Sequence, residues 1–286
     1  MARAKPHPFL TISELETKAY EIRQDLITAL VAAKSGHSAG PLGMADIFTA
    51  LYFRVLNISP ERKNDALRDR LVLSNAHICP VLYATLAQRG FCDRKEFLTS
   101  LRKLGHPFQG HSNNHFNIGI ETCGGPLGQG LSQAVGMALA ARMDSAKWRT
   151  FAMLSDGELD EGQTWEAVML AGKERLHRLT AVVDRNNIQI DGFTENIMPL
   201  EPLADKWRAF NWHVIEIDGH NIGQFIDAVG EAKAVYEKPT VIIAHTIPGK
   251  GVSFMENKFE WHGKPPNPEE AKLALEELRK HVTANT

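Results

Sequence analysis

Residues 150–187, "TFAMLSDGELDEGQTWEAVMLAGKERLHRLTAVVDRNN", decide the fold. The apolar runs at 150–154 and 179–184 have the length and composition of buried strands, and the segment from about Gln163 to Lys173 is typical of a helix. A strand, a helix and a second strand in this order predict a β-α-β unit with parallel strands. The first strand is followed by an acidic turn that holds four carboxylates in six positions: Asp156, Glu158, Asp160 and Glu161.

The rest of the chain extends this pattern. Further apolar runs lie at 70–74, 213–219 and 240–246, and helices are predicted after the first two of them, at 75–90 and 221–237. Apolar strands that alternate with helices predict an α/β fold, with a mostly parallel sheet and helices on both faces. Ligands of such sheets bind at the carboxyl ends of the strands, where the acidic turn lies. Because no internal repeat or interdomain linker is found, residues 1–286 are predicted to form a single domain.

The amino-terminal region is predicted to be helical. A helix is expected after Thr11, with Ser13 and Glu16 as its capping box, and it should end at the loop "KSGHSAGPLG" (34–43).

The middle of the chain contains a long segment, 106–130, without a sustained period, and loops of this length in compact domains are usually functional. A helix rich in glycine and alanine is predicted at 127–143, and a short polar helix is predicted at the carboxyl end.

Composition excludes several classes of protein. Lys plus Arg total 32 against 34 Asp plus Glu, so no basic field favours binding to nucleic acid or to an anionic membrane. The three cysteines, Cys79, Cys92 and Cys123, form no C-x-x-C pair and are expected to be reduced core thiols. No signal peptide is evident, and no apolar run approaches the ~18 residues of a membrane span. We therefore expect a cytoplasmic protein.

The acidic turn and the end of the next strand suggest a metal site. Asp156 follows the first strand of the unit and Asn186 follows the second, thirty positions later (186 − 156). Both should therefore reach one surface crevice, and a carboxylate, an amide oxygen and a backbone carbonyl suit Mg²⁺ or Ca²⁺. Such a metal would hold a diphosphate. The alternative for Asp156 alone is a helix cap, and for Asn187 a turn-forming residue.

At this point the chain resembles a known family. "SDG" (155–157) followed by "NN" (186–187) resembles the thiamine diphosphate signature, which usually opens with Gly-Asp-Gly. Other matching segments appear in the order found in transketolases, and together they extend from about Lys34 to Gly263: "SGHSAGPLG" (35–43), "LVLSNAHICPVLYATL" (71–86), "QGHSN" (109–113), "GGPLGQGLSQAVGMALA" (124–140) and "WHG" (261–263). The chain resembles the amino-terminal, diphosphate-binding part of a transketolase.

The resemblance implies residues that bind the cofactor and its metal. Asp156 and Asn186 would ligate Mg²⁺ or Ca²⁺ by their side chains and Ile188 by its carbonyl, and Gly157 would lie against the diphosphate. The segment Gly125, Pro126 and Leu127 would pack against the aminopyrimidine of thiamine diphosphate.

The resemblance also implies catalytic residues. His37 and His77 would contact the diphosphate end or the sugar donor, and His111 and His262 would line the substrate channel. Glu161 and Glu166 resemble carboxylates that link two active sites at a dimer interface, with Glu161 counted as catalytic and Glu166 as a cofactor contact. The alternatives are a structural role for an isolated His and, for the two glutamates, complementing the helix dipole.

The chain departs from the family pattern at several positions. Ser155 replaces the first Gly of the signature, "SGHSAGPLG" replaces "SGHPGAPMG", and "SNAH" replaces "SNGH". His106 in "GHP" competes with His111 in "GHS" for one family position, and the distance to "GPLGQG" favours His111.

By resemblance, the chain is expected to transfer a two-carbon ketol unit from a ketose phosphate to an aldose phosphate. Two enzyme alternatives carry the same signature, the first component of 2-oxo acid dehydrogenases and deoxyxylulose phosphate synthase. A non-catalytic scaffold is a further alternative, supported only by Ser155.

A partner is expected because the family needs a glutamate on the aminopyrimidine, which lies in a separate pyrimidine-binding domain. Only one polar helix follows "WHGKPP" (261–266) here. We therefore expect a second polypeptide that carries this glutamate, two copies of each chain, and the helix at 127–143 in the interface.

Overall fold

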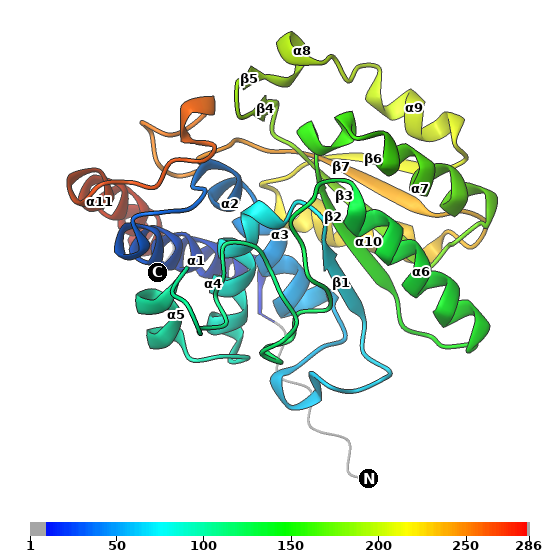
Figure 1. Cartoon of the computed structure of the whole chain (residues 1–286), viewed down its shortest axis with the longest axis horizontal. Helices are drawn as coiled ribbons and strands as arrows, with labels where there is room; N and C mark the ends of the chain where they lie inside the picture. Colours follow the sequence, from blue (N-terminus) through cyan, green and yellow to red (C-terminus); the bar gives the residue numbers. More distant parts are fainter. Residues whose placement is uncertain (1–9, 285–286) are drawn as a thin grey trace.

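The computed structural model describes residues 10–284, and a five-stranded sheet lies at its centre, in the order β1-β2-β3-β7-β6 (Figure 1). All neighbouring strands are parallel. This confirms the predicted mostly parallel α/β fold. The strands are β1 (Arg70–Leu73), β2 (Thr150–Ser155), β3 (Leu179–Arg185), β6 (His213–Asp218) and β7 (Thr240–His245).

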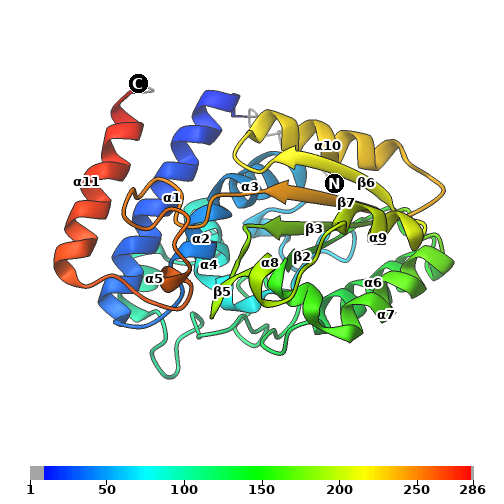
Figure 2. The same ribbon diagram turned by 90° about the horizontal axis from the view of Figure 1, so that it is seen from above.

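Helices cover both faces of the sheet, so the central strands β2 and β3 are buried along their whole length and β7 along most of it. Along β2, Phe151 and Met153 belong to one apolar cluster, whereas Ala152 and Leu154 belong to the other. Figure 2 shows the two helical layers on either side of the strands. One layer contains α6 (Gln129–Met143), α7 (Gly162–Lys173) and α9 (Leu203–Ala209); the other contains α1 (Ile12–Ala33), α3 (Ala45–Ala50), α4 (Cys79–Arg89) and α10 (Ile222–Ala234).

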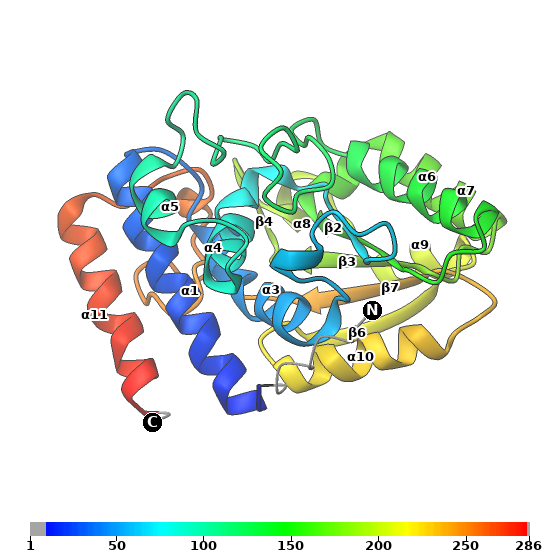
Figure 3. The same ribbon diagram turned by 90° about the horizontal axis from the view of Figure 1, so that it is seen from below.

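Helix α1 lies beside α11 (Pro268–Ala284) and α5 (Arg94–Ser100), as Figure 3 shows from below. The predicted helices at the two ends of the chain are confirmed, but the predicted capping box is wrong. Thr11 caps α1: its hydroxyl accepts a hydrogen bond from Glu14 N, and the Glu14 carboxylate accepts one from Thr11 N at 2.7 Å. Ser13 is already inside the first turn, because Ile12 begins the helix.

The segment predicted as a loop at 34–43 is partly helical, since α2 spans Ala39–Gly43. Close packing explains the difference. A Cβ at Gly40 would lie 2.9 Å from Ile78 Cγ2, and one at Gly43 would lie 3.0 Å from the Ile247 carbonyl oxygen. These tertiary contacts, rather than the helix propensity of a Gly-Pro sequence, hold α2 in place.

The predicted long loop is confirmed between α5 and α6. Cys123 lies in it and is exposed, so the expectation that all three thiols lie in the core is wrong for this residue. Within residues 10–284, no helix is both long and apolar enough to span a membrane. The helix predicted at 75–90 begins with a 3₁₀ turn at Ala76–Ile78 before α4. Several short elements were not predicted: β4 (Ile188–Gln189), β5 (Gly192–Phe193), α8 (Thr194–Ile197), a π-helix at Leu51–Val55, and 3₁₀ turns at Pro60–Arg62, Gly157–Asp160 and Phe259–Trp261.

Candidate active site

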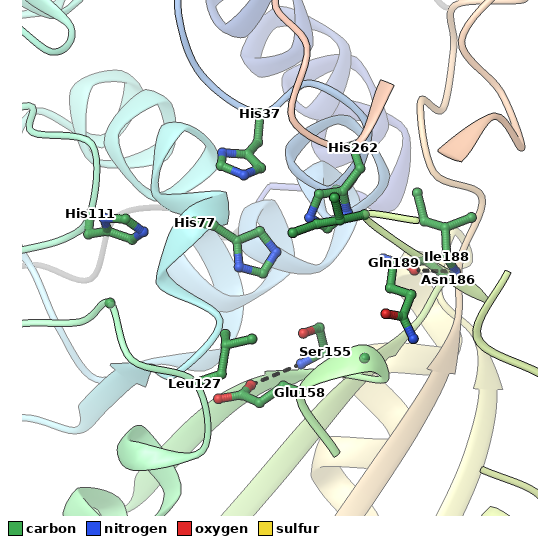
Figure 4. Close-up of a pocket in the computed structure, with 14 residues that line it drawn as sticks. His37, His77, His111, Leu127, Ser155, Glu158, Asn186, Ile188, Gln189 and His262 are labelled. Carbon is green, nitrogen blue, oxygen red and sulfur yellow. Dashed lines mark hydrogen bonds between the residues drawn. The ribbon is translucent and has the colours of Figure 1, made fainter. Parts of the chain in front are cut away.

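A cavity of about 280 Å³ opens at the carboxyl ends of β2 and β3 (Figure 4). Segments that are far apart in the sequence meet in it, because parallel strands end at the same edge of the sheet. Its lining contains four histidines together with residues from the acidic turn and from the segment after β3: His37, Gly40, His77, His111, Gly125, Leu127, Ser155, Gly157, Glu158, Asn186, Ile188, Gln189, Ile190 and His262.

Asp156 lies between Ser155 and Gly157, which line the cavity, but its own side chain is fully buried and does not line it, so its predicted place in a surface crevice is wrong. Oδ1 accepts a hydrogen bond from Gly157 N at 2.8 Å, and Oδ2 accepts from Asn187 N at 2.6 Å and Arg185 Nη1 at 3.1 Å. Burial raises the pKa of Asp156 to about 6, although the Arg185 charge and the hydrogen bonds act in the opposite direction. The carboxylate is therefore desolvated and already held by three donors.

Asn186 and Ile188, which follow β3, line the cavity. Asn186 Nδ2 donates to Asp184 Oδ2 at 2.8 Å, and Ile188 N donates to Asn186 Oδ1 at 3.0 Å. Asn187 has a φ of 63° and its side chain does not line the cavity, so the turn-forming interpretation fits it. The hydrogen bond from Asn187 N to Asp156 Oδ2 joins the ends of β2 and β3.

Arg185 is a buried cation that sequence reasoning did not assign to the site. Its guanidinium is 3% exposed and pairs with Asp156, and it also donates to Thr194 Oγ1 at 2.9 Å. Nη2 donates to Glu195 at 2.6 Å and to Glu201 at 3.0 Å. Arg185 therefore connects Asp156 to α8. Its position directly before Asn186 in the sequence was the available signal.

Three histidines form a cluster on one wall of the cavity (Figure 4). Ring centroids are 5.1 Å apart for His37 and His77, 5.4 Å for His37 and His262, and 5.2 Å for His77 and His262. Burial, and then the neighbouring histidines, lower the pKa of His37 to about 4 and that of His77 to about 3. Burial also lowers the pKa of His262. All three imidazoles are therefore neutral at pH 7.

One polar atom in this cluster has no partner. His37 Nδ1 is buried and makes no hydrogen bond to any residue between 10 and 284. Buried polar groups normally find partners, so an unpaired nitrogen beside a cavity indicates a place for a polar ligand.

His111 lies at the rim of the cavity and is exposed. Its pKa is lowered by partial burial and by the Arg102 charge. His106 instead pairs with Glu96 at 3.0 Å and does not line the cavity. The structure therefore brings His111, and not His106, to the other histidines.

Two glycines allow the backbone to approach the cavity closely. Gly125 has a φ of 150°, and a Cβ at Gly157 would lie 3.3 Å from the Cβ of Gln189. Gly125 and Leu127 line the cavity, whereas Pro126 lines an adjoining cavity of about 250 Å³.

The glutamates of the acidic turn and of α7 differ in their surroundings. Glu161 and Glu166 are exposed and lie outside the cavity lining. Glu158, which had no predicted role, lines the cavity and is fully buried. Its carboxylate accepts hydrogen bonds from Gly128 N at 2.8 Å, from Ser155 N at 3.2 Å and from the Ser74 hydroxyl. Sequence alone gave no signal for these partners, two of which lie on distant loops.

Comparison with known proteins identifies the family of the chain. Residues 16–282 match the family described as transketolase, thiamine diphosphate binding domain. The 6-deoxy-6-sulfo-D-fructose transketolase subunit of Clostridium sp. is 45% identical over 93% of this chain and 97% of that protein. One apulose-4-phosphate transketolase subunit, from Phocaeicola vulgatus, is 37% identical over 96% of each chain.

Solved structures give the same result. A transketolase variant from Pichia stipitis has a TM-score of 0.86 and 31% identity, and the match covers 96% of this chain. The chain spans 44% of the length of that transketolase, but nearly the whole length of the two relatives above. The chain belongs to the transketolase family, as a thiamine diphosphate binding domain.

Proposed function

We propose that the chain is the diphosphate-binding subunit of a two-chain transketolase. Together with a pyrimidine-binding subunit it transfers a two-carbon ketol unit from a ketose phosphate to an aldose phosphate. Two relatives that match over nearly their full length are named as transketolase subunits, which supports a divided enzyme.

The observation that carries this proposal is a cavity with cofactor-binding features but no available carboxylate. Among the described residues that line it, Glu158 is the only acid, and its carboxylate is buried against Gly128 N, Ser155 N and the Ser74 hydroxyl of this chain. We infer that the partner subunit supplies the glutamate that binds the aminopyrimidine. The oxygen ligands and histidines of this chain would form the remainder of a transketolase site.

The metal ligands we propose are Asp156, Asn186 and the Ile188 carbonyl, and the first two pass a count of lone pairs. An ionised carboxylate offers about four acceptor positions, and Asp156 uses three of them. Asn186 Oδ1 accepts one hydrogen bond and keeps a second lone pair. Between residues 10 and 284, no three His, Cys, Asp or Glu side chains are placed to share a metal ion. An oxygen set that includes an amide and a carbonyl suits Mg²⁺ or Ca²⁺.

Thiamine diphosphate would lie between the metal site and the glycine loop. Gly157 would face the diphosphate, and Gly125, Pro126 and Leu127 would face the aminopyrimidine. The unpaired His37 Nδ1 and the close backbone at Gly157 fit such a polar ligand. When bound, the cofactor supplies the carbon nucleophile that attacks the ketose carbonyl.

The histidines would bind the sugar substrate. His37 and His77 are neutral because burial lowers their pKa values, so each ring can donate one hydrogen bond and accept another. Such groups bind sugar hydroxyls as both hydrogen-bond donors and acceptors. His111 at the rim and His262 in the cluster would contact the part of the sugar farther from the diphosphate.

The partner surface we propose is the exposed side of α6 and α7, which lie beside each other (Figure 1). Met143 at the end of α6 is 83% exposed, and Met169 in α7 is 55% exposed. Glu161 and Glu166 are exposed at the start of α7, where they could contact a second copy of this chain. Two copies of each chain, with Glu161 near the symmetry axis, would bury this surface. Obligate interfaces of this kind exceed ~2,000 Å² in total.

A donor panel tests the function. The chain, purified with its partner subunit, should transfer a ketol unit to ribose 5-phosphate from xylulose 5-phosphate or from 6-deoxy-6-sulfo-D-fructose, the sugar named for one relative. Pyruvate decarboxylation without ketol transfer would favour a 2-oxo acid dehydrogenase component. Binding of thiamine diphosphate without any turnover would favour a scaffold.

A further inference from the structure

Asp184 is a buried carboxylate at the end of β3 that has no role in the site described above. Its side chain is 1% exposed and accepts two hydrogen bonds. Asn186 Nδ2 donates to Oδ2 at 2.8 Å, and the Thr246 hydroxyl donates to Oδ1. Val182 and Val183, which precede it in the strand, are buried and apolar, whereas Arg185, which follows it, is buried and pairs with Asp156. A polar side chain at this place therefore needs a reason other than packing, because burying it is costly unless it is fully bonded.

The two hydrogen-bond partners of the Asn186 amide determine where its oxygen and its nitrogen lie. Asp184 Oδ2 accepts a hydrogen bond from Asn186 Nδ2 at 2.8 Å. On the other side, Ile188 N–H can only donate, so it requires the amide oxygen. A flipped amide would oppose oxygen to oxygen at Asp184 and donor to donor at Ile188. Both neighbours therefore select one orientation.

Asp184 is also tied to the second ligand through the backbone. Its carbonyl accepts a hydrogen bond from Asp156 N at 3.1 Å, and its Cα pairs with Ser155 in β2 and with Ala244 in β7. The backbone of Asp184 is thus fixed at the carboxyl end of β3, the middle strand of the sheet. One residue holds the backbone of Asp156 and the side chain of Asn186 at the same time.

We propose that Asp184 is a positioning residue of the metal site, which turns the Asn186 amide so that its oxygen is the atom offered to the cation. This inference rests on the proposed function. Partners that orient metal ligands typically change metal affinity by about 10- to 100-fold when they are removed.

The experiment measures Mn²⁺ binding by electron paramagnetic resonance at saturating thiamine diphosphate, on the complex of the full chain with its partner subunit. Asp184→Ala removes the acceptor and should weaken Mn²⁺ binding about 10- to 100-fold. Asp184→Asn keeps an oxygen acceptor for Asn186 Nδ2 and should stay within about threefold of the wild type. A purely structural role predicts no such rescue of metal affinity.

A second pair of variants keeps the test open if Asp184→Ala does not fold. Thr246→Val removes one of the two bonds that hold Asp184, whereas Thr240→Val changes a buried hydroxyl in β7 that has no hydrogen-bond partner among the described residues. Only Thr246→Val should weaken Mn²⁺ binding, by at least about threefold.

Three results would overturn the inference. The first is Mn²⁺ binding by Asp184→Ala within about twofold of the wild type, and the second is equal binding by the two threonine variants. The third is a loss in Asp184→Asn as large as that in Asp184→Ala, which would assign the effect to charge. A wild-type complex that binds no Mn²⁺ with thiamine diphosphate would instead refute the proposed function, and this inference with it.

Discussion

Replacing Asp156 by Asn separates the stability of the fold from the binding of the metal. The substitution keeps the size of the side chain and removes its charge. Two effects on stability then oppose each other. Burial raises the pKa of Asp156 from 3.8 to about 6, so keeping it ionised at pH 7 costs the folded state about 3 kcal/mol at 1.36 kcal/mol per unit. Asp156→Asn removes this cost, because an amide is uncharged.

The opposing effect is the loss of an acceptor. The NH₂ group of the introduced amide would face either Gly157 N or the pair Asn187 N and Arg185, and an unsatisfied buried donor costs about 1–3 kcal/mol. Arg185 still has Glu195 and Glu201 as partners. The two effects nearly cancel, so the free energy of unfolding of the metal-free variant should lie within about 2 kcal/mol of the wild-type value at pH 7.

Adding thiamine diphosphate and Mg²⁺ should then distinguish Asp156→Asn from the wild type. At concentrations 100 times Kd, thiamine diphosphate and Mg²⁺ should stabilise the wild type by about 2.7 kcal/mol. This raises Tm by about 5–10 °C at about 2–4 °C per kcal/mol. Asp156→Asn should show no such rise in differential scanning fluorimetry. Asp160→Asn is the matched control, because Asp160 lies in the same turn but is exposed, and it should keep the full shift. An equal rise in Asp156→Asn would refute the metal assignment.

Three further predictions concern the histidines and the partner surface. His111→Ala and His262→Ala should lower turnover ~10²- to 10⁴-fold and leave cofactor affinity unchanged; steady-state kinetics and calorimetry check this, and an equal loss of affinity would place them at the diphosphate. Because the pKa of His37 falls from 6.5 to about 4 on folding, the unfolded chain binds the extra proton and stability must decline as pH falls through this window. Urea unfolding at several pH values should show a shallower decline in the free energy of unfolding for His37→Gln than for the wild type. An equal decline in both would contradict the lowered pKa of His37. Gly136→Arg on α6 should weaken association with the partner in analytical ultracentrifugation, whereas Gly230→Arg on α10 should not, since both glycines are exposed with open space around them; equal association would exclude the α6 face.

The positions of the strands in the sequence and their parallel direction could be predicted because they depend on local patterns. The apolar runs at 150–154 and 179–184 form β2 and β3 almost at the predicted bounds. Asp156 and Asn186 could be brought together from sequence because parallel strands joined by one helix end at the same edge of the sheet.

The burial of individual charges could not be predicted in the same way. Of the four carboxylates in the acidic turn, Asp156 and Glu158 are buried, whereas Asp160 and Glu161 are exposed. The 3₁₀ turn at Gly157–Asp160 sets these directions, and the partners of Glu158 lie on other loops, at Ser74 and Gly128. The pairing of Arg185 with Glu195 and Glu201 depends in the same way on the path of the chain after β3.

The capping of α1 and the helical state of α2 show a further limit. Both Thr11 and Ser13 can cap a helix, and each is followed three positions later by Glu. Only the position of Ile12 as the first helical residue selects Thr11. Helix α2 depends on contacts of Gly40 and Gly43 with distant residues, which a local pattern does not contain.

The central claim is that this chain holds one half of a transketolase site. Its most direct test is a ketol-transfer assay on the chain alone and after addition of the partner subunit, at saturating thiamine diphosphate and Mg²⁺. We predict no transfer by the chain alone and transfer once the partner is present. Full activity in a preparation that mass spectrometry shows to contain only this chain would contradict the claim.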